Sequence, residues 1–111
     1  MEINKRDIAN EIANIVSSDR VVLFMKGSPR FPQCGFSASA VKMLMLAGVT
    51  QFKHINVLED SLIREGIKEY SSWPTIPQLY VNQEFIGGAD IMQELSHRNE
   101  LRQIVETKSE Q

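Results

Sequence analysis

The chain has no second cysteine. Cys34 is the only one in 111 residues, so no disulfide can form within the chain. Structural disulfides belong to oxidising compartments, and a single cysteine therefore predicts a reducing setting, for which we take the cytoplasm. A Cys-x-x-Cys pair can close on itself during disulfide exchange, whereas a lone thiolate must find its second sulfur on another molecule.

Long hydrophobic runs and an excess of positive charge are also missing. The most apolar stretch, residues 38–49, is interrupted by Lys42 and is too short to cross a bilayer. The first seven residues carry charge where a signal peptide needs an apolar run. The formal net charge is −2, and no basic stripe is present, which argues against a nucleic-acid partner. We therefore expect partners other than membranes and nucleic acids.

The first half of the chain alternates between helical and extended patterns. Ile8, Ile12 and Ile15 recur at helical spacing and predict a helix over residues 5–17 with Asn4 as its N-cap. Residues 21–25 form a continuous apolar run, which is typical of a strand buried on both faces. A second helix is expected over residues 37–47, ended by Gly48 and with one apolar stripe made of Phe36, Ala40, Met43 and Ala47.

The second half adds three strands and three helices. A strand is expected over residues 52–57, and a helix through Ile63, Ile67 and Tyr70 must end before Trp73-Pro74. Two strands, 77–81 and 84–86, are joined tightly at residues 82–83, where an asparagine tolerates positive φ. Asp90 and Gln93 form a capping-box-like helix start, and a short final helix follows a break at residues 97–99.

This order predicts an α/β fold with one four-stranded mixed sheet flanked by about five helices. The first two strands are joined by a helix and should run parallel, whereas the last two should form an antiparallel pair. Thioredoxin-like folds have this layout, and so do other small α/β domains, so topology alone says little about function.

Cys34 lies between a proline-containing loop and the first turn of the predicted second helix. Unpaired N–H groups at a helix start carry partial positive charge and favour a thiolate. Lys26, at the end of the first strand, stands at the mouth of the same loop and adds a full charge. The plainer alternatives are a buried structural cysteine and a solvated lysine. Ser37 can bond locally to the backbone, but it cannot resolve a mixed disulfide as a thiol would.

Two further segments carry polar groups suited to a small peptide. If the peptide bond between Ile76 and Pro77 is cis, the backbone before it is turned outward and can pair with an extended ligand; otherwise the proline only begins an edge strand. Residues 87–90 place two glycines before a helix start, which favours an anion, and Asp90 could hold an ammonium group or serve as an N-cap. Together with Lys26, these groups match a zwitterionic thiol peptide, and glutathione is the abundant candidate.

Four segments together closely resemble the monothiol glutaredoxins of the Cys-Gly-Phe-Ser type. They are residues 25–29, Met-Lys-Gly-Ser-Pro; residues 32–37, Pro-Gln-Cys-Gly-Phe-Ser; residues 73–80, Trp-Pro-Thr-Ile-Pro-Gln-Leu-Tyr; and residues 87–90, Gly-Gly-Ala-Asp. The resemblance implies one glutaredoxin domain over residues 1–111, with a core of about 5–106 and a polar tail at 107–111. It also implies a thioredoxin fold with a cis-proline at Pro77.

The resemblance further implies the site and its ligands. Cys34 would be the catalytic thiol and would bind a 2Fe-2S cluster shared between two subunits. Glutathione would be the other cofactor, and its binding residues would be Lys26, Arg64, Ile76, Pro77, Gly88, Ala89 and Asp90. The cluster would be held in a homodimer, with two glutathione thiols completing its four thiolates. Iron–sulfur acceptor proteins and a BolA-like protein are the further partners that the family implies.

The chain departs from the family at Ala89, and a second function is compatible with the same residues. Many relatives have a cysteine where this chain has Ala89, so a disulfide between that position and Cys34 is impossible here. The leading hypothesis is a cluster carrier active in iron–sulfur assembly and trafficking. The rival is a glutathione-dependent thiol-disulfide oxidoreductase that removes glutathione from proteins by a monothiol mechanism. Poor activity of Cys-Gly-Phe-Ser relatives and the bulk of Phe36 argue for at most a weak enzyme.

Overall fold

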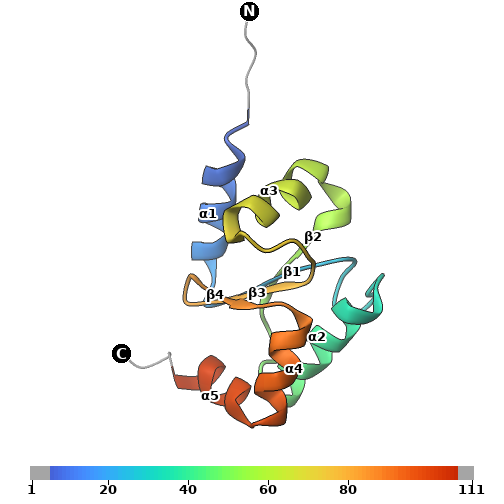
Figure 1. The fold of residues 1–111 in the computed structure, drawn as a ribbon, viewed down its shortest axis with the longest axis vertical. Helices are drawn as coiled ribbons and strands as arrows, with labels where there is room; N and C mark the ends of the chain where they lie inside the picture. The colour runs from blue at the N-terminus through green and yellow to red at the C-terminus, as the bar shows by residue number, and fades with distance from the viewer. Residues whose placement is uncertain (1–5, 108–111) are drawn as a thin grey trace, which may run out of the picture.

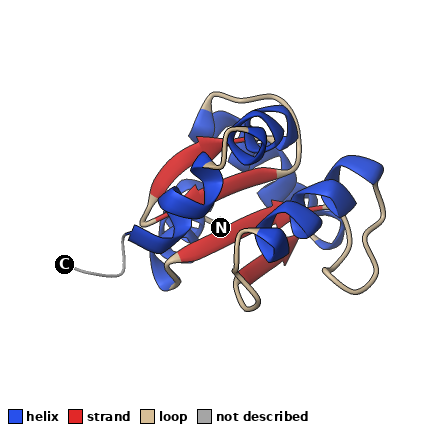
Figure 2. Ribbon diagram, turned by 90° about the horizontal axis from the view of Figure 1, so that it is seen from below, coloured by secondary structure: helices blue, strands red, loops and turns tan. Residues whose placement is uncertain are grey.

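The structure, a computed structural model, describes residues 6–107 and contains one four-stranded sheet between two layers of helices (Figures 1 and 2). The strands are β1 (Val21–Met25), β2 (Lys53–Asn56), β3 (Gln78–Val81) and β4 (Glu84–Gly87). The helices are α1 (Ile8–Ser18), α2 (Gly35–Leu46), α3 (Ser61–Ser71), α4 (Ala89–His97) and α5 (Glu100–Thr107), with a 3-10 helix η1 (Val57–Glu59).

The sheet has the predicted mixture of strand directions. Its order is β2-β1-β3-β4. The central strand β1 pairs in parallel with β2 and antiparallel with β3, and β3 pairs antiparallel with β4. Asn82 and Gln83 both have positive φ, 51° and 69°, as the mirror-image turn of a tight hairpin requires. The predicted parallel and antiparallel pairs are therefore confirmed.

Helices cover both faces of this sheet, as Figure 1 shows, with α1 and α3 on one side and α2, α4 and α5 on the other. Side chains of β1 alternate between the two cores. Val21, Leu23 and Met25 pack against the layer of α2, α4 and α5, whereas Val22 and Phe24 pack against α1 and α3. All five are buried, which confirms a strand covered on both faces.

The close approach of α1 to α3 depends on Gly66. A Cβ atom at this position would collide with the side chain of Ile8 and come within 3.1 Å of Cδ1 of Ile12. Ile12 is fully buried, as is Ile67 on the facing helix. The two helices therefore share a seam in which a glycine leaves room for the isoleucine side chains.

Three predicted helix starts differ from the structure. Asn4 lies outside the described residues, but α1 begins only at Ile8, where Asp7 accepts the N–H of Asn10 and acts as the N-cap. The helix predicted over residues 37–47 already begins at Gly35. Asp90 does not cap α4: Gly88 is the N-cap, and no side chain bonds to the free N–H groups there. A short polar residue near a helix start has the same sequence pattern whether its side chain accepts a helix N–H group or not, so the sequence alone did not distinguish the two cases.

The apolar stripe predicted for α2 is wrong at one position. Ala40, Met43 and Ala47 are buried as expected, but Phe36 is 64% exposed. Phe36 lies in the first turn of α2, where it lines a cleft instead of packing into the core. Gly48 ends the helix with φ of +93° as predicted. None of the helices among residues 6–107 has the length and apolarity needed to cross a membrane.

Candidate functional site

A cleft of about 390 Å³ opens where β1 ends and α2 begins. Its lining includes all eight residues that the sequence singled out: Lys26, Cys34, Arg64, Ile76, Pro77, Gly88, Ala89 and Asp90. These residues come from five separate parts of the chain, and the fold brings them into one depression. The lining also includes residues that the sequence did not single out, among them Phe36, Lys68 and Trp73.

Cys34 is the N-cap residue of α2 and is partly exposed at the floor of the cleft. The pKa of its thiol is lowered, above all by a hydrogen bond from the backbone N–H of Ser37. The N–H of Phe36, the charge of Lys26 and the hydroxyl of Ser37 act in the same direction, while partial burial opposes them. A helix N-terminus offers its free N–H groups to an anion. The thiolate is therefore favoured, as the sequence predicted.

Ser37 is fully buried, and its hydroxyl links two parts of the site. The Oγ atom accepts the backbone N–H of Lys26 at 3.0 Å, and its proton is available to the Cys34 sulfur. A hydroxyl has one donor and two acceptor sites, so it can serve both neighbours at once. The serine that stands in place of a second thiol is thus a structural part of the site.

The turn after β1 holds the lysine and the cysteine at a fixed separation. The carbonyl of Lys26 accepts the N–H of Gln33 at 2.9 Å, which ties the residue before Cys34 back to the strand end. Gly27 has φ of +92°, and a Cβ there would lie 2.5 Å from the carbonyl oxygen of Phe31. Only glycine fits such a position without displacing the loop.

The opposite wall of the cleft is the segment between α3 and β3. The peptide bond between Ile76 and Pro77 is cis, as predicted. Gln78, fully buried, donates both hydrogens of its side-chain amide to carbonyl oxygens, that of Trp73 at 3.0 Å and that of Thr75 at 3.1 Å. The buried amide thereby fixes the course of the wall. The sequence had marked the segment, but not the contribution of Gln78.

The start of α4 closes the cleft on a third side. Gly88 packs so closely that a Cβ atom there would lie 3.1 Å from the carbonyl oxygen of Pro77 and 3.1 Å from Nε1 of Trp73. Ala89 and Asp90 follow in the first turn of α4, and both line the cleft. The free N–H groups of the helix start, which attract an anion, thus lie beside the carboxylate of Asp90, which attracts a cation. Together they suit a ligand that carries a negative and a positive group.

Helix α3 supplies two cations to the cleft. Arg64 and Lys68 stand one helical turn apart and both line it. Lys68 is also 3.5 Å from Oε2 of Glu65. The spacing i, i+4 places such residues on one helix face, and this was the signal by which the sequence could have revealed Lys68 once Arg64 was suspected.

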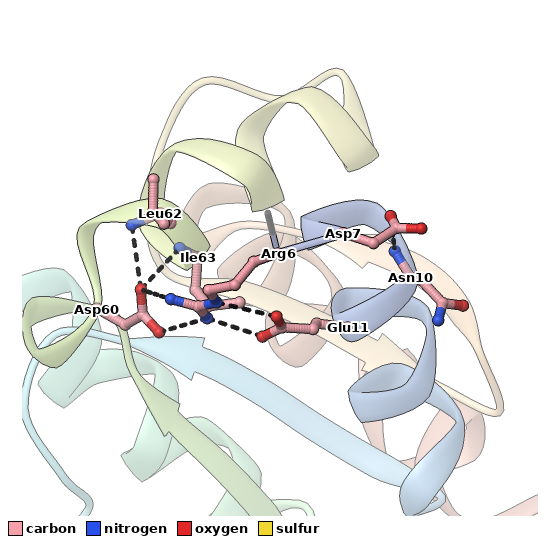
Figure 3. Close-up of polar contacts among 7 residues, drawn as sticks. All are labelled: Arg6, Asp7, Asn10, Glu11, Asp60, Leu62 and Ile63. Atoms are coloured by element: carbon pink, nitrogen blue, oxygen red, sulfur yellow. Dashed lines mark hydrogen bonds and ion pairs between the residues drawn. The ribbon is translucent and has the colours of Figure 1, made fainter. Parts of the chain in front are cut away.

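The N-terminus of α3 is anchored by a salt-bridge cluster around Arg6 (Figure 3). The guanidinium binds Glu11 of α1 through Nη2 at 2.7 Å and Nε at 2.9 Å, and Asp60 through Nη2 at 2.8 Å and Nη1 at 3.3 Å. Asp60 is the N-cap of α3 and accepts the N–H groups of Leu62 and Ile63. The hydrogen bond from Arg6 is the main reason why the pKa of Asp60 lies below its ordinary value.

The arrangement joins one favoured thiolate to cations on two sides and a carboxylate on a third. The described residues 6–107 include no group of three or more His, Cys, Asp or Glu side chains that could hold a metal ion. Cys34 can therefore contribute a single soft ligand to iron, and a complete donor set needs sulfur from elsewhere. The same thiolate can act as a nucleophile toward a disulfide.

Comparisons with known proteins agree with this geometry. A family model described as Glutaredoxin matches residues 21–86. The protein of Lachancea kluyveri named monothiol glutaredoxin-5, mitochondrial, is 54% identical over 97 residues, covering 86% of this chain and 68% of that protein. An uncharacterized monothiol glutaredoxin of Synechocystis is 52% identical, with 86% and 88% covered. The solution structure of reduced poplar apo GrxS14 has a TM-score of 0.76 and 49% identity, with 87% and 88% covered.

Proposed function

Since the chain belongs to the monothiol, Cys-Gly-Phe-Ser branch of the glutaredoxin family and has its thioredoxin fold, we propose that it carries a 2Fe-2S cluster to acceptor proteins. In this proposal, glutathione occupies the cleft, and two chains enclose the cluster between their Cys34 thiolates. The protein then acts in iron–sulfur cluster assembly and trafficking. The observation that carries the proposal is a favoured thiolate in a cleft whose charges match those of glutathione.

The family uses glutathione, and the charges of the cleft suggest how this chain binds it. Glutathione has two carboxylates, one ammonium group and one thiol. Lys26, Arg64 and Lys68 supply cations for the carboxylates, and the start of α4 supplies N–H donors. Asp90 is the partner for the ammonium group. The backbone beside the cis bond at Pro77 would pair with the extended tripeptide and direct its sulfur toward Cys34.

The cluster is the cargo in this proposal, and the chain's residues act on the ligands around it. Four thiolates hold a cluster of this type, of which two chains provide two and two glutathiones provide the rest. The N–H groups of Ser37 and Phe36 lower the pKa of Cys34 and so favour the thiolate, the form that binds iron. Because half of the ligands belong to a dissociable tripeptide, an acceptor's cysteines can replace them one at a time.

Anaerobic reconstitution tests the proposal directly. Purified chain is mixed with ferrous iron and sulfide, with and without glutathione, and followed by visible absorption and native mass spectrometry. We expect a coloured species of two chains, one cluster and two glutathiones, formed only with glutathione present. Cys34→Ser should abolish it, and Ser39→Ala, at an exposed position of α2, should not. Equal loading after complete removal of glutathione, or loading of a single chain, would contradict the proposal.

A partly exposed thiol with a lowered pKa also favours a second function, glutathione-dependent thiol-disulfide exchange. The Cys34 thiolate would attack the glutathione sulfur of a protein mixed disulfide, and the protein thiolate would leave. A second glutathione thiolate would then attack the Cys34-bound glutathione, releasing oxidised glutathione and restoring the Cys34 thiolate. Brisk turnover of a glutathionylated peptide, together with failure to form a coloured dimer, would make the enzyme the better description.

The remaining parts of the proposal concern partners and location. Iron–sulfur apoproteins and a BolA-like protein are the expected partners, and residues 1–111 form a single glutaredoxin domain. The unpaired Cys34 supports a reducing compartment, and we propose the cytoplasm. The Lachancea kluyveri relative is named as a mitochondrial protein, so imaging of the tagged chain in its own cells should decide between a cytoplasmic and an organellar location.

A further inference from the structure

The side chain of Asn56 lies beside the turn that carries Lys26, although it is not part of the cleft lining. Asn56 is the last residue of β2 and pairs in register with Met25, the last residue of β1. Its Oδ1 atom accepts the backbone N–H of Gly27 at 2.9 Å and that of Leu58 at 3.0 Å. One side-chain oxygen therefore joins the end of β2 to a turn 29 residues earlier in the chain.

The bond to Leu58 has a local explanation, whereas the bond to Gly27 does not. An asparagine that accepts the N–H two residues ahead forms an Asx turn, which is common where a strand ends. The bond to Gly27 is not needed for that turn. Met25 and Asn56 are the last pair in the register of β1 and β2. Beyond them no strand carbonyl is available to the N–H of Gly27, and the side-chain oxygen of Asn56 accepts it instead.

Side-chain and backbone partners hold the Lys26–Gly27 turn on each side. Ser37 accepts the N–H of Lys26 at 3.0 Å, and the carbonyl of Lys26 accepts the N–H of Gln33 at 2.9 Å. Asn56 accepts the next N–H along, that of Gly27. Gly27 has positive φ and the loop lies against its Cα. A rotation of the peptide group between Lys26 and Gly27 therefore moves Lys26 on one side and the loop that leads to Cys34 on the other.

We propose that Asn56 is a positioning residue for glutathione binding, which it affects through the backbone of Gly27 by fixing the direction of the Lys26 side chain. This inference rests on the proposed binding of glutathione at Lys26. Asn56 itself does not line the cleft. Without its Oδ1 atom the turn has more freedom, and the ammonium group of Lys26 is less well held over the cleft.

A double-mutant cycle tests the inference. Glutathione affinity is measured under a non-thiol reductant from the fluorescence of Trp73, which is the only tryptophan and lines the cleft. The proteins are the wild type, Asn56→Ala, Lys26→Ala and the double variant. Loss of one positioning hydrogen bond should weaken binding about fivefold in Asn56→Ala. In the Lys26→Ala background, the same substitution should weaken it by less than about twofold, because the group it positions is gone.

Two further variants separate positioning from a general loss of stability. Asn56→Asp keeps an oxygen that can accept both N–H groups, and it should bind glutathione within about twofold of the wild type. Asp7→Ala removes a comparable acceptor, the one that caps α1. It should lower stability toward urea as Asn56→Ala does, with glutathione affinity unchanged.

The outcomes are distinguishable. Unchanged affinity in Asn56→Ala, or the same fold-loss with and without Lys26, would overturn the inference while leaving the proposed function in place. An equal loss of affinity in Asp7→Ala would likewise overturn it, because stability alone would then explain the effect. If Lys26→Ala binds glutathione as tightly as the wild type, the assignment of Lys26 in the proposed function fails, and the role of Asn56 fails with it.

Discussion

Replacing Ser37 with alanine removes both contacts of its buried hydroxyl, and two different measurements follow the two effects. In the wild type, Oγ accepts the N–H of Lys26 at 3.0 Å, and the hydroxyl proton supports the Cys34 thiolate. The substitution deletes both contacts and little else, since the methyl group of alanine occupies the space of the Cβ atom. The backbone N–H groups of Ser37 and Phe36 remain in place beside the sulfur.

The expected loss of stability follows from burial. Ser37 is fully buried, so the N–H of Lys26 would be left without a partner where water does not replace the hydroxyl. An unsatisfied buried donor costs about 1–3 kcal/mol, which corresponds to a fall in melting temperature of roughly 4–15 °C for a domain of this size. The pKa of Cys34 should rise toward its ordinary value but not reach it, because the Ser37 N–H is the largest cause of its lowering.

Two measurements check the two effects. Urea unfolding gives the change in the free energy of unfolding, and the rate of iodoacetamide alkylation against pH gives the thiol titration. Ser39→Ala is the matched control, because it removes an exposed hydroxyl two residues further along the same helix. The reasoning is refuted if Ser37→Ala and Ser39→Ala unfold alike, or if the alkylation profile of Ser37→Ala coincides with that of the wild type.

Three other substitutions have outcomes that the structure sets. Gly27→Ala should destabilise the protein by more than about 2 kcal/mol, since φ is +92° and the new Cβ meets backbone atoms; urea unfolding unchanged within error would contradict this. Gly88→Ala should weaken glutathione binding by displacing the wall at Pro77, measured by tryptophan fluorescence; wild-type affinity would show that the wall yields freely. Tyr80→Phe removes a buried hydroxyl that makes no hydrogen bond of good geometry, its weak contact with the Ser71 hydroxyl aside, and should change stability at pH 7 by less than about 1 kcal/mol. Burial raises the pKa of Tyr80 to about 12, so from about pH 10, where only the unfolded state ionises, the wild type should lose stability that the phenylalanine variant keeps; parallel pH profiles would count against this.

The sequence was sufficient for the elements that periodicity and burial define. The apolar run over residues 21–25 is typical of a strand buried on both faces, and its predicted bounds equal those of β1. The segments that line the cleft could be found because each carries an unusual residue type, such as Cys34, Pro77 or the paired glycines. These segments lie close together in the fold because they adjoin the end of β1, the start of β3 and the end of β4, which lie at the same end of the sheet.

Apart from Lys68, whose spacing from Arg64 could have revealed it, the contributions that the sequence missed depend on contacts or exposure that no spacing reveals. The apolar character of Phe36 predicts a core residue, whereas in the fold it is exposed and lines the cleft. Arg6 pairs with Asp60 across 54 positions of the chain, and Asn56 reaches Gly27 across 29. Charged and amide side chains are common on surfaces, so only the assembled fold distinguishes those that anchor an element.

The missing side chain at Gly66 has a consequence for how inherited variants of such proteins are interpreted. The helix that contains it also presents Arg64 and Lys68, so any bulk added in the seam pushes the cationic face from behind. In the proposed role, a genetic screen for defective iron–sulfur enzymes would then return alleles at this glycine that mimic lesions in the ligand pocket. Ranking alleles by their distance from the reactive sulfur would misassign them, because the damage begins on the far side of the helix.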